Sequence, residues 1–140
     1  MRNLFLLVVV VAALFPLDSF ACRPDMAFVN LPFVEKVEEA SPLFVGQVAE
    51  VGGDYLDFRI ISTRRGTPPA GQSVRVPHES AGYGKCGKLE FTAGDIWLFA
   101  ENDLPFGATT KLTEADLGSD GGADIEAVIQ RVGQRISPGH

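Results

Sequence analysis

A series of short, strand-like segments separated by glycine- and proline-containing turns is the feature that most restricts the fold of this chain. The segments cover residues 43–51, 55–61, 72–76, 89–91, 96–100 and 108–112. In the second segment Leu56, Phe58 and Ile60 alternate with polar residues, as expected for a half-buried antiparallel strand. Strands this short leave exposed edges unless the sheet closes on itself. The pattern therefore predicts a mainly β fold, a five-stranded antiparallel Greek-key barrel over about residues 41–112, with a two-sheet sandwich as the alternative.

Single residues within this pattern indicate where the sheet bends and which face is buried. Gly46 lies inside an otherwise β-rich segment, which indicates a bulge or a bend at that point. Trp97 lies in the most apolar segment and is expected in the core. Tyr55 and Arg59 are expected on the solvated face of their segment, where an exposed ligand-binding patch is the alternative interpretation.

Two helices are expected to flank the strands. In the shorter one Phe33, Val34 and Val37 share one face, and Pro42 follows its end because the residue before a proline avoids helical geometry. The longer, C-terminal helix covers about residues 123–136. Its apolar residues recur at helical spacing: Ile125, Val128, Ile129, Val132 and Ile136.

Residues 1–21 have the organisation of a secretion signal. A positively charged start precedes an uninterrupted apolar run over residues 4–15, and Ser19 and Ala21 are small residues at the two positions that a signal peptidase recognises. The run is shorter than the roughly 20 residues that cross a bilayer, so a retained membrane helix is only the alternative. We expect cleavage after Ala21, one mature domain spanning residues 22–140, and a secreted or periplasmic location.

Cleavage there would make Cys22 the new amino terminus. Cys86 is the only other cysteine, so an exported chain has a single possible disulfide, and two free thiols are the alternative. A cysteine directly after a cleavage site is also where bacterial lipoproteins carry their lipid. Because Ser19 stands where those signals usually have leucine, a lipid anchor on Cys22 is a further alternative rather than the main expectation.

The net charge and the distribution of basic residues argue against two classes of binding partner. Its formal net charge is −6, and its basic residues form no cluster beyond Arg64 and Arg65. Binding to nucleic acid or to an anionic membrane surface requires concentrated positive charge, so neither is expected. The sequence gives no reason to expect a cofactor.

Several short blocks resemble one family in their order and spacing. Residues 41–48 (SPLFVGQV), residues 55–60 (YLDFRI), and Cys86-Gly87 followed by an apolar strand at residues 97–100 are similar to the TIMP-like, or netrin-like, OB-fold proteins. These are the tissue inhibitors of metalloproteinases and their bacterial relatives. The resemblance covers most of residues 22–112. It implies an OB-type barrel and a protein without enzymatic activity.

In the animal inhibitors the terminal cysteine chelates the catalytic zinc of a protease through its α-amine and backbone carbonyl. A disulfide meanwhile ties its side chain to the central loop. The resemblance gives these roles to Cys22 and Cys86, with Cys22 acting as a metal ligand only toward the zinc of a target protease. It also implies a neighbouring contact loop made of Tyr83, Gly84 and Lys85.

Two positions depart from the inhibitor pattern. Arg23 stands where the inhibitors have a small hydroxyl residue that enters the specificity pocket of the protease, and Pro24 stands where they have a second cysteine. A long cation fits an apolar pocket badly, because burying an unpaired charge is costly. These departures favour a carry-over of the fold above a carry-over of the inhibition. The leading expectation is an exported, disulfide-bonded protein-binding domain, and inhibition of a zinc metalloprotease through Cys22 is one form that this binding could take. The alternative is a structural or surface-associated OB-fold module without inhibitory activity.

Other polar residues suggest chemistry only weakly. His78 beside Ser80 suggests a hydrolase, but neighbours in an extended segment point to opposite faces and no nucleophile elbow is present. His140 has no ligand partners near it in sequence. Two sets of aspartates are candidates for a calcium site: Asp54 with Asp57, and Asp116 with Asp120 and Asp124. The second set lacks EF-hand spacing, so turn and helix-cap roles are expected instead.

Overall fold

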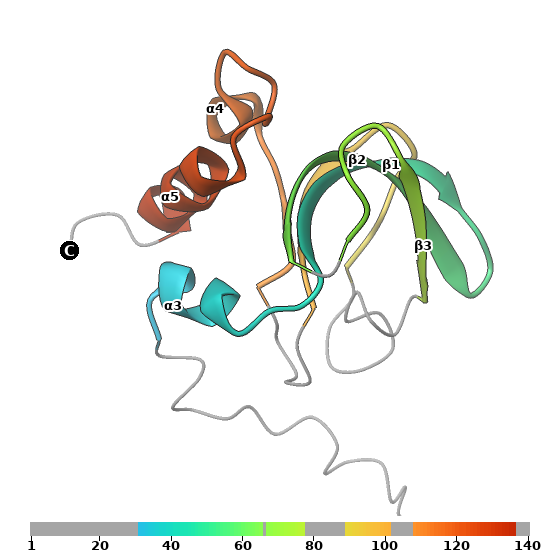
Figure 1. Cartoon of the computed structure of the whole chain (residues 1–140), viewed down its shortest axis with the longest axis horizontal. Helices are drawn as coiled ribbons and strands as arrows, with labels where there is room; N and C mark the ends of the chain where they lie inside the picture. Colours follow the sequence, from blue (N-terminus) through green and yellow to red (C-terminus); the bar gives the residue numbers. More distant parts are fainter. Residues whose placement is uncertain (1–30, 66, 78–88, 102–107, 137–140) are drawn as a thin grey trace, which may run out of the picture.

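The structure is a computed structural model, and it describes residues 31–65, 67–77, 89–101 and 108–136. Figure 1 shows a strongly curved sheet on one side of the molecule and the helices on the other. The elements in chain order are α3 (Phe33–Glu38), β1 (Leu43–Val51), β2 (Tyr55–Arg65), β3 (Ser73–Pro77), β4 (Ile96–Ala100), β5 (Thr110–Lys111), α4 (Glu114–Leu117) and α5 (Ile125–Ile136).

The five strands form one antiparallel sheet in the order β3-β2-β1-β4-β5, which confirms the mainly β prediction. The central strand, β1, pairs with β2 along its whole length, whereas β4 pairs only with its first half, from Leu43 to Gln47. Within the described part of the chain no pairing joins β3 to β5. The sheet is therefore open, and the predicted closed Greek-key barrel is not seen.

The bend predicted at Gly46 is confirmed as an irregularity of β1. The pairing of β1 with β2 shifts register between Val45 and Gly46, and again on either side of this point. A Cβ atom at Gly46 would lie 2.9 Å from the ring of Phe44 and 3.2 Å from the ring of Phe58. The absence of a side chain here lets the two aromatic rings pack directly over the backbone of β1.

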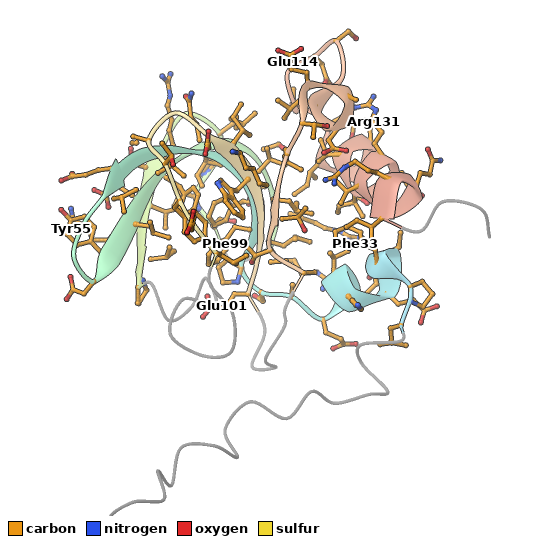
Figure 2. The ribbon with its side chains drawn as sticks, turned by 180° about the vertical axis from the view of Figure 1, so that it is seen from behind. Phe33, Tyr55, Phe99, Glu101, Glu114 and Arg131 are labelled. Carbon is orange, nitrogen blue, oxygen red and sulfur yellow. The ribbon has the colours of Figure 1, made fainter. Side chains whose placement is uncertain are left out.

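The central strands are buried on both faces, which explains why residues 43–45 and 96–100 are almost continuously apolar. Toward the helices, Leu43, Val45 and Leu98 pack with residues of α3 and α5. Inside the curve of the sheet lies an aromatic core made of Phe44, Phe58, Trp97 and Phe99 with the aliphatic side chains Val48, Leu56, Ile60 and Val76. Figure 2 shows Phe33 on the helix side and Phe99 on the strand side. Trp97 is 3% exposed, so its predicted core position is confirmed.

Several elements differ from the sequence-based expectation. Residues 89–91 were expected to form a strand but are irregular, and Leu89 and Phe91 instead attach through their side chains to the aromatic core. The strand β2 continues to Arg65, because β1 pairs with it as far as Leu43 opposite Arg65. The short helix α4 was not expected. Helix α5 is where the spacing predicted it, but Ile136 is 48% exposed and does not join the core.

Candidate functional site

The residues to which the family resemblance assigns a role lie outside the described residues. They are Cys22, Arg23, Pro24, Tyr83, Gly84, Lys85 and Cys86. The same holds for His78 and His140. The predicted disulfide, the zinc-directed terminus and the contact loop therefore stay predictions. The structure describes the elements to which these segments are joined.

Residues 78–88, which include the predicted contact loop, are joined at both ends to described parts of the domain. On one side, Pro77 is the last residue of β3 and pairs with Tyr55 of β2. On the other side, the chain resumes at Leu89, which packs against the aromatic core. The ring of Phe91 lies 4.3 Å from that of Trp97 and 6.2 Å from that of Phe58. Residues 78–88 are thus joined at one end to a paired strand and at the other to partly buried residues that pack against the aromatic core.

The segment that follows the predicted mature terminus joins the folded part at α3. This six-residue helix begins after Pro32 and buries Phe33 and Val37. Its packing against α5 is close, since a Cβ atom at Gly133 would lie 3.4 Å from Val34. The helical region therefore holds the start of the described chain against the rest of the domain.

An ion-pair network reinforces this position of α3. The carboxylate of Glu38 accepts from Arg64 at 3.3 Å and from Arg65 at 3.2 Å, and Arg64 also pairs with Glu126 of α5 at 2.8 Å. The side chains are between a quarter and roughly three-fifths exposed, and surface pairs of this kind contribute about 0–1 kcal/mol each. The network orients α3, while the buried apolar residues supply most of the energy.

Four exposed or partly exposed side chains gather on the face of β1, β2 and β3 opposite the aromatic core. Arg75 binds Asp57 through two hydrogen bonds of 2.7 Å and 2.9 Å, and its guanidinium group lies 3.9 Å from the centre of the Tyr55 ring. The Tyr55 hydroxyl donates to Glu50 at 3.0 Å. Tyr55 lies on the strand face predicted for it, but the residue predicted to share an exposed patch with it was Arg59. The structure couples it with Glu50 and Arg75 instead, and those pairings depend on a strand register that the sequence alone does not fix.

The electrostatics of this cluster favour fixed charges over proton transfer. The two hydrogen bonds from Arg75 hold the pKa of Asp57 below its usual value. The hydrogen bond to Glu50 raises the pKa of Tyr55, and the pairing with Asp57 raises the pKa of Arg75. Each shift moves a pKa further from neutral pH, whereas a general acid or base needs a pKa near the working pH. The arrangement suits a rigid surface more than a catalytic centre.

The carboxylate of Asp116 forms a second group of charged contacts, and unlike the cluster around Arg75 it is buried. Its side chain accepts from the backbone N–H of Thr113, while the Thr113 hydroxyl accepts from the Asp116 N–H, so the two form a capping box at the start of α4. Arg135 of α5 also binds this carboxylate at 2.9 Å. Burial favours the neutral acid, but Arg135 and Thr113 together outweigh it and lower the pKa of Asp116.

The predicted turn and cap roles of the C-terminal aspartates are confirmed. Besides Asp116, Asp120 accepts from the backbone N–H of Gly122, and Asp124 accepts from two N–H groups in the first turn of α5. The pairing of Asp116 with Arg135 was not anticipated, because nothing in the local sequence links residues on two different helices. Among the described residues no group of three potential ligands is placed to hold a metal ion.

Comparisons with known proteins add no assignment: a scan against protein-family models, a search of curated proteins and a search of solved structures found no match. Of the helices in the described ranges, none is long and apolar enough to cross a membrane.

Proposed function

We propose that this chain is an exported, disulfide-bonded protein-binding domain of the TIMP-like OB type. Its proposed partner is a zinc metalloprotease, engaged by the mature amino terminus at Cys22. The observation that carries this proposal is the strand order β3-β2-β1-β4-β5 around an inward-facing aromatic core. A sheet in this order becomes a five-stranded barrel if its two edge strands, β3 and β5, come together.

The connections of the sheet also support the proposal. The segment that contains Cys86 leaves the edge strand β3 and returns to β4, which lies on the other side of the central strand β1. A disulfide from Cys22 to this segment would tie the mature terminus to a connection that is fixed at one end by strand pairing of β3 and at the other by the packing of Leu89 and Phe91 on the aromatic core. Fixing a binding element in advance reduces the entropy lost when it binds.

The chemistry of the terminus fits a catalytic zinc ion. Such an ion has three protein ligands and a water, and an amine with its neighbouring carbonyl oxygen can replace that water. An α-amine ordinarily has a pKa of about 8, so the release of its proton at neutral pH costs little free energy. The proposed activity therefore needs a free, unmodified amino group on Cys22.

Titration of the purified mature protein against a panel of zinc proteases tests this proposal. We expect inhibition at micromolar concentration or below. A matched variant with one alanine inserted before Cys22 keeps both cysteines but displaces the amine from the zinc. It should inhibit at least about 100-fold more weakly, which corresponds to about 2.7 kcal/mol of binding energy.

The departure at Arg23 provides a second arm of the same experiment. Because an unpaired cation is costly to bury, Arg23→Thr should inhibit proteases with apolar specificity pockets about tenfold or more better than the unchanged protein. If neither protein inhibits any protease at micromolar concentration, the alternative of a structural or surface-associated module holds. Inhibition that is unaffected by the inserted alanine would place the contact elsewhere on the domain.

A further inference from the structure

We draw no further inference here: the strongest candidate, the exposed cluster of Glu50, Tyr55, Asp57 and Arg75 on β1, β2 and β3, carries nothing because its charged groups already pair within the cluster and nothing in the structure shows what covers it.

Discussion

Asp116 shows how one buried carboxylate joins two short helices. It caps the first turn of α4 through Thr113 and also binds Arg135 near the end of α5. Its pKa is lower in the folded protein than its usual value. Above the pKa that Asp116 has in the unfolded chain, its ionised form contributes its full stabilisation of the fold. This contribution disappears as the pH falls through the lower pKa that Asp116 has in the folded protein.

We predict that Asp116→Asn lowers the free energy of unfolding at pH 7 by about 2 kcal/mol. The value lies below the usual cost of breaking a buried pair because Arg135 is partly exposed. Urea unfolding measures it. The gap between the two proteins should begin to shrink below about pH 5, where aspartate in the unfolded chain starts to protonate, and should close once the pH falls below the lowered pKa of folded Asp116.

The matched control is Glu114→Gln, which removes an exposed carboxylate from the same helix and should change stability by less than about 0.5 kcal/mol. An Asp116→Asn deficit that stays constant over the whole pH range would contradict the role given to the ionised carboxylate.

Gly46 gives a second test at the scale of a residue. We predict that Gly46→Ala destabilises the protein by about 1–3 kcal/mol, because the new methyl group would press on the buried rings of Phe44 and Phe58. Thermal or urea unfolding measures the effect. The control is Gly53→Ala in the β1–β2 turn, where a Cβ atom meets nothing within 4 Å and little loss of stability is expected. Equal effects at both positions would contradict the packing around Gly46.

Among the elements, those with a clear apolar period were predictable from sequence. Alternation located β2 through Leu56, Phe58 and Ile60, and helical spacing located α5 through Val128, Ile129 and Val132, because each set faces one core. Pairing with β1 sets the end of β2, which single-segment patterns do not reveal. Helix α4 has only four residues, too few for a period, and its one local signal was the pair Thr113 and Asp116.

Helix α5 is expected to be an integral part of the fold. We predict that Ile129→Ala lowers the free energy of unfolding by about 2–5 kcal/mol, since Ile129 is 1% exposed in the core between the sheet and the helices. The neighbouring exposed residue serves as control, and Gln130→Ala should cost less than about 0.5 kcal/mol. Chemical denaturation of both variants decides the matter. A small loss for Ile129→Ala would mean that α5 can detach without unfolding the sheet.

For the whole molecule, the sequence predicted a mainly β domain with flanking helices, and the structure confirms this class. The predicted closure is not seen in the described residues, since no pairing joins β3 to β5. Such pairing depends on contacts between segments far apart in the chain, which the pattern of single strands does not reveal. The signal pattern predicted Cys22 as the mature terminus, but its zinc-directed role came from family resemblance alone, and Cys22 lies outside the described ranges. For the exposed cluster around Tyr55 and Arg75, the sequence predicted the solvated position of Tyr55 but not its partners. The cluster draws its residues from three strands, so its pairings depend on strand register.

The proposed disulfide has a consequence for the stability of the whole domain. A link between Cys22 and Cys86 closes a loop of about 65 residues, which should stabilise the fold by about 4 kcal/mol through the entropy of the unfolded chain. We predict that Cys86→Ser lowers the urea midpoint accordingly, and that dithiothreitol lowers the midpoint of the unchanged protein but not that of the variant. A midpoint that does not change on reduction would argue against the link.

The most direct test of the central claim is mass spectrometry of the mature protein, purified from an exporting host without reducing agent. We expect a chain that begins at Cys22 with an unmodified amino group and whose terminal peptide is joined to the peptide containing Cys86. A terminus that still carries the leader, a lipid on Cys22, or two free thiols would contradict it.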